Sequence, residues 1–194
     1  LMATASQLKS LLKLVGWQHL ELNEAGARLV HKGMFINLDG CVRAYAIDSV
    51  IKLWRRHGVN HGLVELDRDA ATLGTRPDGT NWMIGVRHPI GSRVAITRLK
   101  LNDRGLTVRG DFERQITLNG ERFGWGLSPV DGLPVPGPLS VVVAADTCLS
   151  ACAAASIARL KTDKAAQAWL EDLGLPWLVI DRELNCLGPL APKH

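Results

Sequence analysis

The sequence predicts a mixed α/β fold in which largely antiparallel sheets are covered by helices. Three patterns indicate this class. Residues 139–145 form an apolar, β-branched run, which is typical of a buried strand. Asn119-Gly120 lies between two short segments and has the turn chemistry of a type I′ hairpin. Residues 42–56 carry apolar side chains at helical spacing and are followed by Gly58, a residue that often ends helices.

Composition is that of an ordinary globular domain. The chain has 194 residues, of which 46% are hydrophobic and 22% charged, enough for a single domain over residues 1–194. The net charge is +4 and the basic residues are scattered, so nothing indicates nucleic-acid binding. No apolar run reaches the roughly 18 residues that a membrane span needs.

The first elements follow from short-range patterns. Leucines and a valine at helical spacing predict a helix over residues 1–16 with Ser6 as its cap. Residues 18–22 and 28–31 are expected to pair as a hairpin around the turn at residues 23–26.

Residues 34–48, MFINLDGCVRAYAID, are the stretch around which the chain is organised. We expect a short strand over residues 34–38, a turn at Asp39-Gly40 and a helix from Val42 to about residue 56. Such a turn is either an ordinary strand-to-helix connection or an anion site built from free backbone N–H groups. Tyr45 is expected to face the core, and Asp48 is expected to pair with a basic residue of its own helix.

The remaining elements are predicted from alternation, apolar runs and turn residues. Strands are expected at residues 61–66, 82–87, 93–101, 106–108, 115–118, 121–123, 139–145, 177–181 and 184–187, with a short segment at 70–73, and helices at 148–160 and 163–172.

The four cysteines have no zinc-site spacing. Cys148 and Cys152 are four residues apart, on one face of the predicted helix, and their neighbours are mostly alanine, leucine and serine. We expect buried small hydrophobic residues; a metal or redox pair is the alternative.

Several segments, in order, resemble one known family. Residues 37–48 resemble the D-L-G-G-I-A-K-G-Y-A-V-D segment of the FAD:protein FMN transferase (ApbE) family. Residues 65–74, ELDRDAATLG, are similar to its N-L-G-G-D-I-R-A-L-G, and residues 109–114, RGDFER, to its S-G-D-Y-E-R. The resemblance extends from about Leu8 to Leu187 and implies an ApbE-like domain without the family's N-terminal part.

Polar positions of the family are altered. Asp67 and Arg68 stand where the family has two glycines, while Asp69 is retained. The family's stretch Y-S-H-I-x-D has Trp125 at its histidine and Ser128 at its aspartate. Trp125 cannot accept a proton or bind a metal, so we expect it to pack in the core, with stacking on a flavin as the alternative.

The family's helix A-D-A-L-A-T-A is expected to hold Mg²⁺ through its Asp and Thr, one helical turn apart. Aligned from Asp146, these positions carry Ala151 and Ala155, whose methyl groups cannot bind a metal. A one-residue shift would bring Ser150 or Ser156 nearer, but a neutral hydroxyl does not replace a carboxylate. We therefore expect no metal site and no Mg²⁺.

The resemblance implies a flavin-transferase fold that has lost FMN transfer and acts as a binding or structural subunit of a protein assembly. The first alternative is an active, divergent enzyme that moves FMN to Thr or Ser of a target protein. The second is a flavin- or nucleotide-binding module without metal, with Arg43, Arg68 or Arg109 as phosphate partners.

The candidate cofactor-binding residues follow from family positions. They are Arg43, Tyr45, Asp69, Arg109 and Trp125. FAD is a possible ligand and a protein is the expected partner, with exposed tryptophans as candidate anchors. The resemblance also implies a periplasmic, possibly membrane-associated, location.

Overall fold

The structure is a computed structural model that describes residues 4–89, 95–110, 115–118, 121–124, 126–135 and 137–192. Its centre is a six-stranded sheet with strand order β12-β11-β10-β7-β4-β3, in which every neighbouring pair is antiparallel. In that order the strands are Cys186–Leu187, Trp177–Ile180, Ser140–Ala145, Gly105–Gly110, Asp69–Leu73 and Gly62–Leu66.

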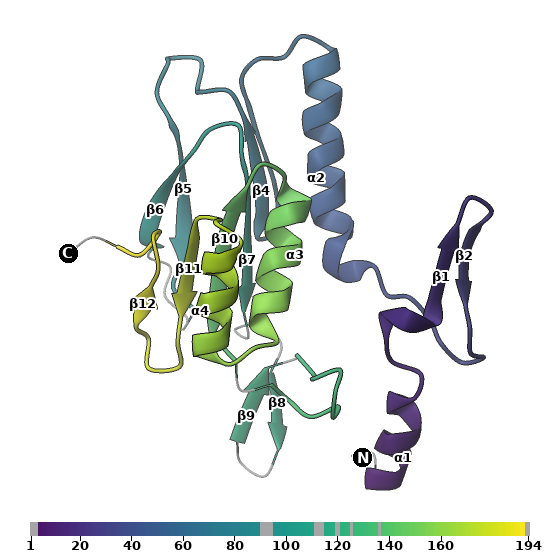
Figure 1. Cartoon of the computed structure of the whole chain (residues 1–194). Coiled ribbons are helices and arrows are strands. Elements are labelled where there is room, and N and C mark those ends of the chain that lie inside the picture. Colours follow the sequence, from purple (N-terminus) through teal and green to yellow (C-terminus); the bar gives the residue numbers. More distant parts are fainter. Residues whose placement is uncertain are drawn as a thin grey trace.

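The sheet that contains the central strand β10 is the middle one of three layers (Figure 1). Helices α2 (Asp39–Arg56), α3 (Cys148–Arg159) and α4 (Asp163–Asp172) cover one face of the sheet. The antiparallel pair β5 (Trp82–Arg87) and β6 (Ala95–Leu101) covers the other. The mixed, largely antiparallel α/β fold predicted from the sequence is therefore confirmed.

Strand β10 shows why its sequence is apolar throughout. Val141 and Val143 contribute to the cluster that includes α3 and α4, whereas Val142 and Ala144 contribute to the cluster that includes β5 and β6. Because successive side chains of a strand point to opposite faces, a strand between two apolar layers needs apolar residues at every position.

The segment that precedes α2 contributes nothing to this core. It contains α1 (Ala5–Leu12), a 3₁₀ turn (Trp17–His19) and the hairpin of β1 (Leu20–Asn23) with β2 (Gly26–Leu29). Figure 1 shows this segment extending away from the sheet, and no residue from 4 to 43 is buried. We call residues 4–38 the N-terminal arm.

Two predictions for the arm were wrong. Residues 34–38 form no strand: no strand within the described ranges pairs with them, and Phe35 is 82% exposed. Helix α1 is shorter than predicted and is capped by Thr4 rather than Ser6: the Thr4 side chain accepts from the Gln7 N–H, and the Gln7 side chain accepts from the Thr4 N–H.

The remaining described pair is β8 (Gln115–Leu118) with β9 (Glu121–Gly124), the hairpin that Asn119-Gly120 predicts. The turn residues themselves lie outside the described residues.

Candidate functional site

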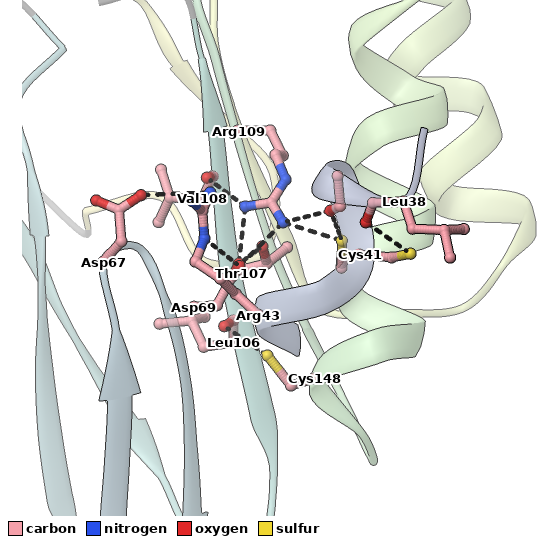
Figure 2. A network of polar contacts seen from close by, with 12 residues as sticks. Leu38, Cys41, Arg43, Asp67, Asp69, Leu106, Thr107, Val108, Arg109 and Cys148 are labelled. Carbon is pink, nitrogen blue, oxygen red and sulfur yellow. Dashed lines mark hydrogen bonds and ion pairs between the residues drawn. The ribbon is translucent and has the colours of Figure 1, made fainter. Parts of the chain in front are cut away.

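The candidate site lies where four segments meet: the first turn of α2, the β3–β4 turn, strand β7 and the α2-facing side of α3 (Figure 2). We call it the junction, and define it by Gly40, Arg43, Asp69, Arg109 and Cys152. The family resemblance pointed to three of these residues, Arg43, Asp69 and Arg109. The structure brings those three together.

Asp69 is the centre of the junction. It is the first residue of β4, lies opposite Thr107 of the neighbouring strand β7, and is 0% exposed. Its carboxylate accepts hydrogen bonds from the Thr107 hydroxyl and from Arg109, whose Nη1 lies 2.7 Å from Oδ1 and whose Nη2 lies 3.1 Å from Oδ2. This fork-to-carboxylate pairing is the strong, oriented form of an ion pair.

Arg109 is placed by the register of β7. Thr107 and Arg109 are two residues apart in one strand, so both side chains leave the same face of the sheet and reach the same carboxylate. Arg109 Nη1 also donates to the Val108 carbonyl at 3.1 Å, and Nη2 lies 3.4 Å from the Gly40 carbonyl and 2.9 Å from Cys152 Sγ. Burial lowers the pKa of Arg109, but the hydrogen bond and charge of Asp69 outweigh it, so the pKa is raised.

Arg43 is held more loosely. Its Nη2 lies 3.4 Å from Asp67 Oδ2 and its Nε lies 3.8 Å from Asp69 Oδ2, and its side chain is 49% exposed. Arg68 belongs to the same charged group: burial lowers its pKa, and the charges of Arg109 and Arg43 lower it further, against the opposing effect of Asp67. Three arginines therefore gather around two carboxylates.

The β3–β4 turn shows what the two lost glycines required. Asp67 adopts a φ of 61°, in the left-handed region, whereas Arg68 is not among the residues with positive φ. Only one of the two positions needs the conformation that favours glycine, and aspartate tolerates it better than most residues.

Helix α3 presents different residues to the apolar cluster and to the junction. Ala151 and Ala155 belong to the apolar cluster between α3, α4 and the sheet, so neither faces the junction. Cys152 does: its Sγ lies 3.0 Å from the Gly40 carbonyl. The α3 side chain at the junction is therefore Cys152, one residue after Ala151, and the position one turn further along is Ser156. The alignment of the family's metal ligands with Ala151 and Ala155 stays a prediction.

These residues do not fit Mg²⁺. The ion prefers hard oxygen ligands in octahedral geometry. The α3 side chain that faces the junction is a thiol, and a guanidinium already lies beside it. Within the described ranges, no three His, Cys, Asp or Glu side chains come together as a metal-binding group.

Asp48 has a role that sequence reasoning missed. We expected it to pair with a basic residue of its own helix, which is wrong. Its carboxylate instead accepts from the first N–H groups of α3, Cys148 N at 2.8 Å and Leu149 N at 2.9 Å. A carboxylate of one helix thus caps the N-terminus of another. No local pattern relates positions that are 100 residues apart.

Other candidates have different outcomes. Tyr45 is 63% exposed, so the expectation that it faces the core is wrong; contact with a flavin stays a prediction. Trp125 lies outside the described residues. Cys148 and Cys152 are both buried, as expected, and burial raises the pKa of the Cys148 thiol well above its usual range.

A six-stranded antiparallel sheet, covered by helices on one face and by a two-stranded pair on the other, makes this chain a mixed α/β domain. The ApbE family model matches residues 2–179, and the chain belongs to the ApbE family.

Individual relatives agree with this assignment. A FAD:protein FMN transferase of Klebsiella pneumoniae (strain 342) is 27% identical over 142 residues, which cover 70% of this chain and 41% of that protein. A FAD:protein FMN transferase of Chlamydia pneumoniae is 28% identical over 167 residues, 82% of this chain and 51% of that one. The chain thus spans about half the length of these relatives, or less.

Solved structures show the same fold. The apo form of Pseudomonas stutzeri flavinyl transferase ApbE superimposes with a TM-score of 0.85 at 23% identity, over 98% of this chain and 60% of that one. The ApbE protein of Thermotoga maritima gives a TM-score of 0.86 at 23% identity, over 97% of this chain and 62% of that one.

Among the described residues, no helix is long and apolar enough to cross a membrane.

Proposed function

We propose that this chain is an ApbE-fold protein that has lost metal-dependent FMN transfer and acts as a binding or structural subunit of a protein assembly. The relatives are named for moving FMN from FAD to a protein. The observation that carries the proposal is the contact of Arg109 Nη2 with Cys152 Sγ at 2.9 Å, at the position where α3 faces the first turn of α2.

The chemistry explains why this contact matters. Transfer of a phosphoryl-linked group depends on positioning and on neutralising the charge of the phosphates, which a divalent cation usually supplies. The Cys152 thiol is not a ligand that Mg²⁺ prefers, and the Arg109 guanidinium already donates to groups of the junction. Together they provide neither a metal-binding site nor a cation that is available to a phosphate. The family's histidine position carries Trp125, which has no acceptor for a proton.

An FMN-transfer assay tests the proposal. The purified chain is incubated with FAD and a Thr- or Ser-containing target protein, with and without Mg²⁺, and in-gel flavin fluorescence is read from the target. An active ApbE protein run in parallel is the positive control. We expect no labelled target with this chain; Mg²⁺-dependent labelling would show an active enzyme and overturn the proposal.

A second candidate function is a flavin- or nucleotide-binding module that works without metal, and Arg43 favours it. Its two ion pairs are long, 3.4 and 3.8 Å, and its side chain is half exposed, so its N–H groups can turn to a diphosphate at small cost. Arg109 is a poorer phosphate partner than we expected from the sequence, because both of its terminal nitrogens already donate to groups of the junction.

Calorimetric titration with FAD, with and without Mg²⁺, tests this second function. The variant pair is Arg43→Ala and Arg55→Ala: both arginines are on α2, and Arg55 has a similarly long ion pair, 3.8 Å from Asp103. The binding module predicts metal-independent binding that is weakened by R43A and kept by R55A. Equal effects of the two substitutions, or no binding by the unchanged protein, would remove this function.

The partner and the location belong to the same proposal. A subunit role requires a protein partner, and Trp17, 86% exposed, is a candidate anchor for it. We also propose a periplasmic location, which cell fractionation with compartment markers tests.

A further inference from the structure

The guanidinium of Arg109 is enclosed by the kinds of group that bind cations. Two carboxylate oxygens of Asp69 lie 2.7 and 3.1 Å from its nitrogens. The carbonyls of Val108 and Gly40 lie at 3.1 and 3.4 Å, and Cys152 Sγ lies at 2.9 Å. Figure 2 shows Asp69 and Val108 beside the guanidinium, and dashed lines that run from the guanidinium towards α2 and α3.

The enclosure depends on a positive charge. Asp69 is 0% exposed, and a buried carboxylate is stable only when a cation or several donors compensate for its lost hydration. Thr107 supplies one neutral donor, Arg109 supplies the close charge at 2.7 Å, and Arg43 supplies a second, half-exposed charge at 3.8 Å. Without Arg109, the enclosure would present a buried anion, two carbonyl oxygens and a sulfur.

Helix α3 relates the enclosure to the cation that the family resemblance implies. The helix position that faces the Gly40 carbonyl is Cys152, and its sulfur is within contact distance of both that carbonyl and the guanidinium. Carboxylate and carbonyl oxygens are what Mg²⁺ and Mn²⁺ prefer, and a thiol is not. Two groups of the enclosure therefore exclude a hard metal ion: the Cys152 sulfur, which is a soft ligand, and the Arg109 guanidinium, which already occupies the position of a cation.

We propose that Arg109 is a built-in cation that takes the place of a divalent metal ion at the junction, so that the enclosure accepts an external cation once the Arg109 side chain is removed. This inference deepens the proposed loss of metal-dependent transfer. Its test uses metal ions alone, without flavin, so it can fail while the transfer assay still shows no activity.

The experiment compares the unchanged protein with the double variant Arg109→Ala/Cys152→Asp. Each is titrated with MgCl₂ and MnCl₂ by calorimetry and followed by the midpoint of thermal unfolding. We expect no binding and no shift in midpoint for the unchanged protein. The double variant offers two carboxylates and two carbonyls; we expect it to bind one ion and to gain thermal stability as metal is added.

The control is Arg55→Ala/Leu149→Asp, which removes an arginine and adds a carboxylate outside the junction. We expect it to bind no metal. Binding of Mg²⁺ or Mn²⁺ by the unchanged protein would overturn the proposal, as would a folded double variant that binds neither ion.

The single variant Arg109→Ala keeps the proposal testable where the double variant does not fold. Methylguanidinium carries the same planar cation as the lost side chain. We expect millimolar methylguanidinium to restore folding of R109A, measured by near-UV circular dichroism, while equal concentrations of ammonium and sodium chloride do not. An R109A protein that none of these cations stabilises would also overturn the proposal.

Discussion

The two sides of helix α3 place neighbouring residues under very different constraints. Ala151 and Ala155 press against the sheet and α4 in an apolar cluster, where volume and the absence of polar atoms decide what fits. Cys152 packs towards α2 and also contacts a carbonyl and a guanidinium. A shift of one residue along the helix therefore separates the cluster packed against α4 from the buried side that meets α2 and the junction.

The substitution pair Ala151→Asp and Cys152→Asp gives the largest contrast between these sides. A carboxylate at residue 151 would be buried without a partner, so we expect the variant to lose at least about 4 kcal/mol of stability or not to fold. At residue 152 the new carboxylate would meet Arg109, and we expect a loss of less than about 2 kcal/mol. Urea unfolding measures both; equal losses would show that the two sides are not distinct.

Removing Asp69 tests the junction side itself. Asp69→Ala leaves Arg109 mostly buried without its carboxylate, and we expect a loss of about 3–5 kcal/mol. The control is Asp67→Asn, which removes a carboxylate that pairs with Arg43 at 3.4 Å on a half-exposed surface and should cost about 0–1 kcal/mol. Urea unfolding again gives the difference. A D69A loss as small as that of D67N would mean that the junction does not depend on the ion pair.

Asp48 of α2 binds the N-terminus of α3, on the side of α3 that faces α2. Asp48→Ala removes the acceptor for Cys148 N and Leu149 N, and we expect a loss of about 1–2 kcal/mol, the usual size of a capping effect. Asp48→Asn keeps one oxygen acceptor and loses the charge, so its cost should be smaller. If the two variants are equally destabilised, the charge at the helix terminus rather than the hydrogen bonds accounts for the effect.

The sequence predicted best the elements that local patterns determine. Strand β5 over Trp82–Arg87 and helix α4 over Asp163–Asp172 have the predicted bounds. A turn or an apolar period within a few residues is enough to predict each of them. The apolar run of β10 likewise predicted a strand buried on both faces.

The contacts that build the junction could not be predicted this way. Arg109 and Asp69 are 40 residues apart and meet because of the register of β7 against β4. The family's metal-ligand positions were aligned from Asp146 onto Ala151 and Ala155, and the sequence did not show that Cys152 is the side chain of α3 that meets Gly40 and Arg109. The family resemblance supplied the residues, and the structure supplied their partners.

The N-terminal arm, in which no described residue is buried, can be compared with the buried core in the same way. Phe35 is 82% exposed and precedes Ala44, the first buried residue in the part of the chain that the structure describes. We expect Phe35→Ala to change the free energy of unfolding by less than about 0.5 kcal/mol, whereas Leu170→Ala, at 0% exposure in α4, should cost about 2–5 kcal/mol. Urea unfolding at two protein concentrations distinguishes the causes of any larger effect. A large, concentration-dependent loss in F35A would show that the arm is covered by another copy of the chain, and a large, concentration-independent loss would contradict the exposed position of Phe35.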